Sequence, residues 1–488
     1  MSNDPASRPI PRSAAGFPDV FAGDLAERSR MIQAICAVYE RFGFAPLETP
    51  AVEYLDVLGK FLPESDEPAG GVFAFRDDDE QWLSLRYDHT APLSRVVAQY
   101  ASDLPQPFRR YQVGPVYRRE KPGPGRFRQF YQCDFDTVGT RSPAADAEAC
   151  AVLCAAYDAI GLAREDFRVH VNNRKILNGV LERVGLADPV RQNAVLRAID
   201  KLDRLGIEGV RALLGAGRLD QTGVFMPGAK LADEQTKVVL EFVQAGDLDR
   251  GVVLKRMQSI VGESAVGREG VAELRAIGEL LDVLELASSA VCFDPGIVRG
   301  LAYYTGTVFE AQLTFADERG NDRAFGSIGS GGRYDDLVER FTGQKVPATG
   351  GSVGLDRLID ALKASGRLRE QSKLGPVVVT VMDQSRLPEY HGMVRELRDA
   401  GISAELYLGD RGFRAQVKYA DKRNSPAVVI AGSDEFARGE VSIKDMRLGD
   451  ELSDKIVERD AWRKEQPAQR SVPRAQMLPT IREILARP

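Results

Sequence analysis

The chain has 488 residues and a formal net charge of −6, and 43% of its residues are hydrophobic and 28% charged. This composition is typical of soluble globular proteins, and the length suggests about three domains. No apolar run approaches the roughly 18 residues that a membrane span needs, and residues 1–16 contain no apolar signal-peptide core. We therefore expect a cytoplasmic protein with no membrane segment, whose first sixteen residues form a disordered head.

The five cysteines are an odd number without metal-ligand spacing. A reducing compartment fits this pattern better than disulfides do. Cys150 and Cys154 are four residues apart in an alanine-rich helical pattern, and no second ligand pair follows them. They are interpreted as core residues, and no metal site made by protein side chains is predicted.

The first predicted element is a helix over Asp24–Phe42, whose apolar residues recur at helical spacing until Gly43 ends it. Pro46 and Pro50 then interrupt a short extended segment. Prolines there favour the edge of a sheet or an interface over a central strand. The simpler alternative is an ordinary helix followed by a strand.

A strand that begins at Trp82 ends in Asp88, His89 and Thr90, and a helix follows from about Ala91. Thr90 has the side chain of an N-cap residue. Asp88 is either an acid that stabilises the start of the helix or a carboxylate that binds the ammonium group of a ligand. Its position alone does not decide between these interpretations.

The segment Phe108–Asp136 is the most informative part of the chain. Between Arg109 and Arg128 it contains seven basic residues against one acid, Glu120, which points to a polyanionic ligand. Alternating residues on both sides of the turn KPGPG predict a hairpin. Arginine forks near the turn can bind phosphate oxygens and an aromatic ring can stack on a base; the residues are Arg118, Glu120, Arg126 and Phe130. The alternative is an exposed basic hairpin that makes surface salt bridges.

Helical segments with few aromatics extend from Phe167 to about Leu284 and predict an inserted helical domain. Strand signals resume at Val291–Leu313 and continue through Phe325–Val338. The glycines of SIGSGGRYD in the second stretch permit a tight turn or a close approach of the backbone to a ligand. Arg357 lies just inside a predicted helix after a strand, where an arginine is more often a surface residue than a ligand.

A boundary is predicted within Lys363–Leu374, after which strands and helices alternate as in a small α/β domain. Helices are expected at Arg386–Ala400 and near Phe413–Lys422. The segment Arg411–Arg423 contains five basic residues and one acid near strand ends. This count fits contact with nucleic acid and a solvated helix face equally well.

Together these segments resemble the histidyl-tRNA synthetases, which are class II aminoacyl-tRNA synthetases. The helix ending in ETPAVE resembles class motif 1, VYRRE with GRFRQFYQ resembles motif 2, and GGSVGLDRL resembles motif 3. LRYDHTAP and RGLAYYTGTVFEA resemble the histidine-specific segments. The similarity extends from about Phe17 to Glu458, and Ala302 stands where the family signature has aspartate.

The resemblance implies an α/β fold: an α+β catalytic core with the class II antiparallel sheet flanked by helices, a helical insertion domain and a C-terminal α/β anticodon-binding domain. The implied domains are a head (1–16), a first part of the catalytic core with motifs 1 and 2 (17–166), the insertion (167–284), a second part of the core with the histidine signature and motif 3 (285–365), the anticodon-binding domain (375–458) and a tail (459–488).

The resemblance also implies residue roles. Arg118 and Arg299 would be catalytic, stabilising charge at the ATP α-phosphate. ATP would be bound by Arg118, Glu120, Arg126, Phe130 and Arg357. Histidine would be bound by Asp88, Thr90, Gln132, Asp136, Tyr303 and Tyr304. The tRNA would be contacted by Arg411, Arg414 and Lys418.

The implied reaction is the activation of histidine by ATP, with Mg²⁺, to histidyl-adenylate and pyrophosphate, followed by transfer to the 3′ end of tRNA(His). Such chemistry depends on positioning and cationic stabilisation, so an arginine-rich site is expected. Motif 1 implies a homodimer. The rival hypothesis is an inactive paralogue that regulates ATP phosphoribosyltransferase or senses histidine or tRNA; the terminal domain and the arginines at 118, 126, 299 and 357 argue against it.

Overall fold

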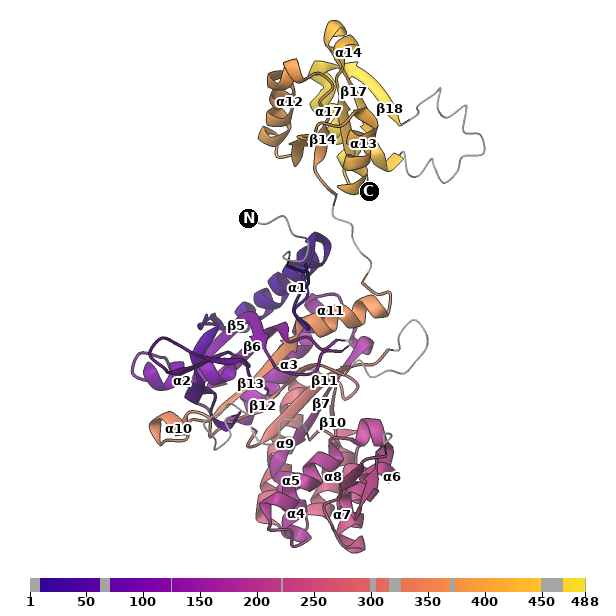
Figure 1. Ribbon diagram of the computed structural model, residues 1–488. Coiled ribbons are helices and arrows are strands. Elements are labelled where there is room, and N and C mark those ends of the chain that lie inside the picture. Colours follow the sequence, from indigo (N-terminus) through magenta and orange to yellow (C-terminus); the bar gives the residue numbers. More distant parts are fainter. Residues whose placement is uncertain are drawn as a thin grey trace. The chain divides into compact units, whose positions relative to one another are not determined.

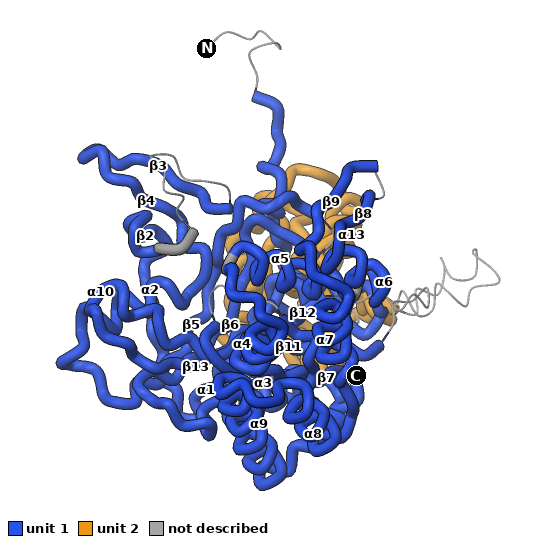
Figure 2. The backbone as a smooth tube through the Cα atoms, turned by 90° about the horizontal axis from the view of Figure 1, so that it is seen from below, with its two compact units in different colours: residues 1–369 blue, residues 370–488 orange. Residues whose placement is uncertain are grey.

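The chain divides into two units, residues 1–369 and residues 370–488, which are coloured separately in Figure 2. The computed structural model describes residues 9–61, 71–123, 125–220, 223–298, 304–315, 326–368, 374–448 and 468–487. The division falls inside Lys363–Leu374, the segment in which the sequence predicts a boundary. None of the described helices is long and apolar enough to cross a membrane.

An eight-stranded sheet forms the centre of the first unit, in the order β1-β5-β6-β13-β12-β11-β7-β10 (Figure 1). The strand pairs from β5 to β7 are antiparallel, and the edge strands β1 and β10 run parallel to their neighbours. The sheet therefore joins segments that are far apart in the sequence. Its strands are β1 (Ala45–Pro46), β5 (Phe108–Tyr117), β6 (Gln129–Val138), β7 (Phe167–Asn173), β10 (Val291–Phe293), β11 (Thr307–Leu313), β12 (Ser327–Arg333) and β13 (Ala348–Gly354).

The strands β5 and β6 form the predicted hairpin, with a register that runs from Phe108↔Val138 to Tyr117↔Gln129. The turn KPGPG and the basic residues on either side of it form the connecting loop. Pro46 lies on β1 at the edge of the sheet, as its effect on strand pairing predicts.

Helices α1 (Ala22–Arg41), α3 (Pro143–Ala159) and α11 (Leu355–Ala364) pack on the sheet and bury its apolar face. The predicted first helix is confirmed to within two residues at each end. Cys150 and Cys154 are fully buried in this core, as the alanine-rich pattern predicts. The helices hold the sheet rigid from one side, and the other side carries polar residues.

Glycines in β12 and β13 leave room for the aromatic side chains of this core. Gly331 pairs with Phe309 of β11, and Gly351 pairs with Phe135 of β6. A Cβ atom at position 331 would lie 2.2 Å from the Phe309 ring, and one at position 351 would lie 2.9 Å from the Phe135 ring. Residues Ser327–Arg333 of SIGSGGRYD thus form a strand and not a tight turn. Packing explains Gly331, while Gly329 lines a cavity.

Smaller elements complete the first unit. A three-stranded sheet has the order β2-β4-β3, and helix α2 follows β4. These elements are β2 (Val52–Tyr54), the 3₁₀ helix η2 (Leu55–Phe61), β3 (Ala74–Arg76), β4 (Trp82–Leu85), α2 (Thr90–Gln99) and α10 (Glu339–Thr342). A further 3₁₀ helix, η3 (Arg164–Asp166), leads directly into β7.

The helical insertion begins later than the sequence predicts. Residues Phe167–Asn173 form β7, which pairs with β10 and β11 inside the sheet. Both faces of this strand are largely buried, so its sequence lacks a clear polar alternation. The insertion then comprises α4 (Arg174–Arg183), α5 (Pro189–Ile199), α6 (Leu202–Leu214), the hairpin β8 (Gly217–Leu219) and β9 (Phe225–Pro227), α7 (Asp233–Val243), α8 (Arg250–Val261) and α9 (Ala265–Val283). Its apolar core is continuous with that of the sheet.

The second unit is a five-stranded sheet in the order β15-β14-β16-β17-β18 with helices on both faces. The predicted helices are confirmed as α12 (Leu387–Asp399) and α13 (Phe413–Lys422). The other elements are β14 (Val377–Val379), η4 (Gln384–Arg386), β15 (Ala404–Leu406), β16 (Ala427–Ile430), α14 (Ser433–Arg438), β17 (Glu440–Asp445), β18 (Gln469–Pro473), η5 (Arg474–Gln476) and α17 (Met477–Leu485).

The C-terminal residues belong to this second unit, which extends it beyond the predicted end at Glu458. Strand β18 pairs antiparallel with β17. Met477, Ile481 and Ile484 of α17 are buried in the same core as α12. The described part of the predicted tail, 468–487, is therefore an edge strand and a packed helix.

A buried ion pair ties α3 to the ends of β12 and β13. Asp146 accepts from Arg333 Nε and Nη2 through Oδ2, at 3.2 and 2.6 Å, and its Oδ1 accepts from Thr349 at 2.8 Å. The side chains are 2% and 6% exposed for Asp146 and Arg333. Arg333 also donates hydrogen bonds to the carbonyls of Thr140 and Ser142, so all three nitrogens of its guanidinium have hydrogen-bond partners.

Asp146→Ala is expected to destabilise the first unit by about 3–5 kcal/mol, because it removes the closest counter-ion of the buried Arg333 guanidinium and leaves only Asp335, at 3.7 Å. Urea denaturation of the full-length protein measures this loss. The matched control is Glu208→Ala, which removes an exposed partner of Arg211 and is expected to cost less than about 1 kcal/mol. Equal losses in the two variants would contradict the role of the buried pair.

Candidate active site

A row of polar side chains crosses the sheet on the face opposite the aromatic core. The register pairs each member with the next, strand by strand, from β5 to β10. The row is Gln112, Asp134, Ser352, Ser330, Glu310, His170 and Cys292. Because a strand alternates its side chains between two faces, these residues point away from α1, α3 and α11.

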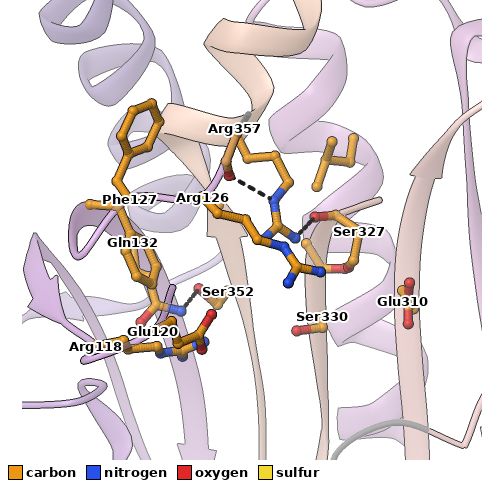
Figure 3. A pocket seen from close by; sticks show the side chains of 15 residues that line it. Arg118, Glu120, Arg126, Phe127, Gln132, Glu310, Ser327, Ser330, Ser352 and Arg357 are labelled. Atoms are coloured by element: carbon orange, nitrogen blue, oxygen red, sulfur yellow. Dashed lines mark hydrogen bonds between the residues drawn. The ribbon is translucent and has the colours of Figure 1, made fainter. Parts of the chain in front are cut away.

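A cavity of about 240 Å³ lies over the middle of this row (Figure 3). Its walls come from the β5–β6 loop, from β6, β11, β12 and β13, and from the start of α11. It brings together all five residues assigned to nucleotide binding by resemblance. They are Arg118, Glu120, Arg126, Phe130 and Arg357, and Gln132, Glu310, Ser330 and Ser352 line the same cavity.

Arg118 is fixed by two aromatic rings at one end of this cavity. Its guanidinium carbon lies 4.4 Å from the centre of the Tyr87 ring and 5.1 Å from that of Phe130. Its Nε donates to the Tyr87 carbonyl at 3.4 Å. Glu120 lies at the same end (Figure 3). Stacking on both rings orients the planar guanidinium, as recognition of a phosphate or carboxylate requires.

Arg357 occupies another wall, in the first turn of α11. Its Nη1 donates to the carbonyl of Ser327 at 2.8 Å and its Nε to the carbonyl of Gly125 at 3.4 Å. The side chain thus connects the β5–β6 loop to β12, with Arg126 beside it (Figure 3). Arg126 is exposed and Arg118 is half-buried. Cations therefore approach the cavity from two directions, which suits a polyphosphate.

A cluster of buried acidic side chains, called the acidic pocket below, lies further along β6. Gln132, Asp134 and Asp136 are successive residues on one face of this strand, so Asp136 stands two steps beyond the first cavity. Its carboxylate contacts Arg110 Nη2 at 2.8 Å and accepts a hydrogen bond from the hydroxyl of Tyr334. Asp136 and Arg110 are 4% and 0% exposed.

Burial and neighbouring charges shift the pKa values of the acidic groups here; the pKa of Asp136 is raised by burial, with the charge of Arg110 opposing. Burial raises the pKa of Asp134 to about 7, although the charge of Arg110 opposes the shift. Burial also raises the pKa of Tyr304, and the charges of Asp136, Asp88 and Asp134 raise it further, which places that tyrosine among three carboxylates. A ligand that carries an ammonium group fits such a pocket.

The backbone of β13 closes against Asp136 without room for a side chain. A Cβ atom at Gly350 would lie 2.0 Å from Asp136 Oδ1 and 2.4 Å from the Phe135 carbonyl. Glycine is therefore required there if Asp136 is to keep its position. Sequence analysis missed Arg110, Asp134, Tyr334 and Gly350; the alternation QCDFD was the one available signal for Asp134.

Asp88 caps helix α2, and its negative charge also raises the pKa of Tyr304. Its Oδ1 accepts from the backbone nitrogens of Thr90 and Ala91, at 3.1 and 2.9 Å. The predicted N-cap, Thr90, is instead the first residue of the helix, and its side chain makes no capping bond. The sequence predicted the wrong cap because aspartate and threonine satisfy the same backbone donors.

His89 has a structural role next to these residues. It is fully buried, and its Nε2 lies 3.3 Å from the Gly114 carbonyl. Burial and the charges of Arg110 and Arg86 lower its pKa to about 3. The side chain is therefore neutral near pH 7 and fills space behind the two buried arginines.

His170 and Cys292 form the far end of the polar row together with Asp294. His170 Nδ1 lies 2.9 Å from Asp294 Oδ2 and 3.5 Å from Cys292 Sγ. Burial lowers the pKa of His170, but the bonds to Asp294 and Cys292 outweigh it and raise the pKa to about 10. The pKa of Asp294 is correspondingly lowered by His170, despite its burial. The two side chains form an ion pair at neutral pH.

The remaining predicted site residues lie elsewhere. Arg299 and Tyr303, like Ala302, lie outside the described residues. Arg411, Arg414 and Lys418 are exposed in the second unit, just before α13 and on it. The amide of Gln416 bonds the backbone of Val381 and the carbonyl of Arg411, which fixes this basic surface to the sheet.

Comparison with known proteins gives a consistent result. Residues 16–358 match the model of the histidyl-tRNA synthetase family, and residues 376–481 match the anticodon-binding domain. The histidine–tRNA ligase of Cereibacter sphaeroides is 54% identical over 497 aligned positions, covering 100% of both chains, and that of Dinoroseobacter shibae is 53% identical over 98% of each. The crystal structure of histidyl-tRNA synthetase from Nostoc sp. superposes with a TM-score of 0.72 at 30% identity, covering 98% of this chain and 100% of that one.

Stability is expected to depend on pH through His170. Below the unfolded-state pKa of 6.5 the imidazole is protonated in both states, and the ion pair contributes fully. As pH rises towards 10 only the folded state keeps the proton, so the contribution disappears. His170→Gln should therefore cost about 2 kcal/mol at pH 6 and much less at pH 10. Denaturation at both pH values measures this, with His391→Gln, an exposed histidine, as the control. A cost independent of pH would contradict the assignment.

Proposed function

Because the chain belongs to the histidyl-tRNA synthetase family, we propose that it performs both half-reactions of histidine–tRNA ligation on the polar face of its large sheet. It is an ATP-dependent histidine–tRNA ligase. Histidine is activated to histidyl-adenylate with release of pyrophosphate, and the histidyl group then passes to the 3′ end of its tRNA. The observation that carries this proposal is the position of β6, which runs from an arginine-lined cavity to a carboxylate-lined pocket.

ATP occupies the cavity over the polar row. Arg118 binds the α-phosphate, Arg126 and Arg357 bind the outer phosphates, and Glu120 contacts the adenine. The ring of Phe130, which contacts Arg118, also stacks on the adenine base. Supporting evidence is the convergence of these side chains on one cavity and the fixed orientation of Arg118 and Arg357.

Histidine occupies the acidic pocket. Asp88, Thr90 and Gln132 hold its ammonium group, and Asp136, Tyr303 and Tyr304 face its imidazole ring. The three carboxylates around Tyr304 favour a cationic substrate. Asp136 is held by Arg110 and Tyr334, so it can accept a hydrogen bond from the ring in a fixed direction. A pocket that bonds the imidazole rejects isosteres, because they leave buried polar groups unpaired.

The histidine carboxylate attacks the α-phosphate in line. No side chain has to accept a proton in this step, so placement of the reacting atoms and stabilisation of the developing charge account for the rate. Arg118 supplies part of that stabilisation and Arg299 the rest. The role of Arg299 is supported by its place in RGLAYYTG, the histidine-specific segment.

Magnesium is expected to accompany the ATP. Among the described residues no group of three His, Cys, Asp or Glu side chains could hold a metal alone. Mg²⁺ is usually bound by one or two carboxylates together with substrate phosphates, and the buried carboxylate of Glu310 in the cavity wall fits that use. The ion would neutralise charge on the phosphates.

The second unit binds the anticodon region of tRNA(His), and Arg411, Arg414 and Lys418 contact the RNA backbone. Arg414 and Lys418 are four residues apart on α13 and so share one exposed face. We also propose that the protein is a cytoplasmic homodimer that pairs through α1 and the segment containing Pro50. The resemblance of that segment to motif 1 supports the dimer.

The first test is ATP–pyrophosphate exchange by the purified protein with Mg²⁺, without tRNA, for each amino acid separately. Exchange should depend on histidine. Asp136→Asn should lower kcat/KM for histidine by about 100-fold, because a buried acceptor is lost. Asp188→Asn is the matched control, since asparagine caps α5 as well as aspartate does. Exchange driven by another amino acid, or by none, would overturn the proposed function.

The double variant Arg414→Ala/Lys418→Ala should raise KM for tRNA(His) about 10-fold and make it less dependent on salt, because two phosphate contacts are removed. Aminoacylation at several salt concentrations measures both effects. Arg395→Ala, an exposed arginine on α12, is the control. An unchanged salt slope in the double variant would remove α13 from the RNA interface.

A further inference from the structure

The β5–β6 loop carries three of the side chains that line the cavity over the polar row, Arg118, Glu120 and Arg126 (Figure 3). Among the described residues of this loop, the hairpin ladder continues for one step, in which the Arg118 nitrogen donates to the Arg128 carbonyl at 2.9 Å. Nearer the tip, Gly123 and Arg126 exchange two backbone hydrogen bonds. A loop held mainly at its base and its tip needs outside contacts to keep its side chains in one arrangement.

Residues 14–17, called the N-terminal strap below, supply the first of these contacts. The Gly16 carbonyl accepts hydrogen bonds from the backbone nitrogens of Arg128 and Gln129, at 2.9 and 3.3 Å. The strap therefore extends the pairing of β6 at the point where the loop begins. The sequence predicts a disordered head over residues 1–16, but these bonds order the end of that segment.

The side chain of Arg128 completes the contact between strap and loop. Its Nη1 donates to the Ala15 carbonyl at 3.4 Å, and its Nε donates to the Glu120 carbonyl at 2.9 Å. One guanidinium thus connects the strap to a residue of the cavity wall. Gly16 allows this close approach: its φ is +82°, and a Cβ atom there would lie 2.7 Å from Arg128 Cγ.

A second segment, residues 71–73, holds the loop from its other strand. The Gly71 carbonyl accepts from the Arg119 nitrogen at 2.9 Å. The ring of Phe73 contacts the ring of Phe17 edge-on, with 5.6 Å between their centres and 64° between their planes. The strap and this segment therefore contact each other as well as the loop, and together they form a clamp around its base.

The strap buries little apolar surface. Ala14 and Ala15 are exposed, and Phe17 is half-buried. Its contribution to the stability of the first unit is therefore small, because burial of apolar area is the main source of that stability. Its hydrogen bonds are directed at the loop. A ligand that binds to an already ordered loop does not have to meet the entropic cost of ordering it.

We propose that the N-terminal strap preorganises the β5–β6 loop for ATP, with Gly16 and Phe17 as positioning residues. This inference rests on the proposed function and deepens it. The strap lies outside the described walls of the cavity, so it acts on ATP through the loop. Asp136 lies between two paired strands, β5 and β13, and does not depend on the strap for its position. The strap should therefore affect ATP and leave histidine binding unchanged.

Histidine-dependent ATP–pyrophosphate exchange by the full-length protein tests this selectivity. Phe17→Ala should raise KM for ATP about 5-fold, the weight of one aromatic pair, and change KM for histidine less than 2-fold. Phe17→Tyr keeps the ring and should behave as wild type. Gly16→Ala reaches the loop through a different contact and should also raise KM for ATP. Phe225→Ala, which removes an exposed phenylalanine of β9, is the matched control.

Equal increases in KM for ATP and for histidine would overturn the proposal, because they would indicate a general loss of structure. An unchanged KM for ATP in both Phe17→Ala and Gly16→Ala would overturn it as well. The thermal midpoint of both variants should stay within a few degrees of wild type, since the strap buries little apolar surface.

Limited trypsin digestion tests the order of the loop without any catalysis. Trypsin cleaves after arginine, and Arg119 and Arg126 of the loop are exposed. Cleavage in the loop should be about 5-fold faster in Phe17→Ala than in wild type, and saturating ATP should reduce the difference. Unchanged cleavage would overturn the strap even if exchange were normal. Exchange that does not depend on histidine in the wild type would instead sink the proposed function, so the two failures are distinguishable.

Discussion

The antiparallel register from β5 to β7 is the constraint on which the rest of this structure depends. It places Phe135, Gly351, Gly331 and Phe309 in one line on the core face. On the other face, the same register places the polar row. A slip of one residue in any strand would exchange the two faces, moving aromatic rings into the site and carboxylates into the core. The glycines secure the register, because only they fit beside the two rings.

Electrostatic contrast along β6 follows from this arrangement. Gln132 stands at a cavity whose arginines suit a polyphosphate, and Asp136, four residues on, stands in a pocket whose carboxylates suit a cation. Buried Arg110 lies between the carboxylates and keeps them from repelling one another freely. Both environments lie within a few residues of one strand, because every second side chain points to the same face of the sheet. Under the proposed function, the two substrates that react with each other would be held side by side.

The helical insertion is integrated with this sheet. Strand β7 leads directly into α4, and the two share an apolar core with α9. A cavity at this junction is lined by charged residues from both parts.

The sequence by itself determined the local elements and the family. The spacing of apolar residues, and the glycines and prolines that end elements, predicted α1, the β5–β6 hairpin, α12 and α13. These signals act over a few residues. Resemblance to the class motifs singled out Arg118, Glu120, Arg126, Phe130 and Arg357, which line one cavity. Pattern alone could not separate the two interpretations of Asp88; the structure shows it capping the start of α2, and ligand binding by its carboxylate stays a prediction.

Only the tertiary structure decided which residues meet across strands. It moved β7 from the insertion into the sheet, since a strand buried on both faces carries no clear alternation. It brought Arg110, Tyr334 and Gly350 next to Asp136, and it placed Asp134 on the same face of β6. These facts depend on strand order and register, which join residues that are far apart in the chain, and no local pattern encodes such pairings.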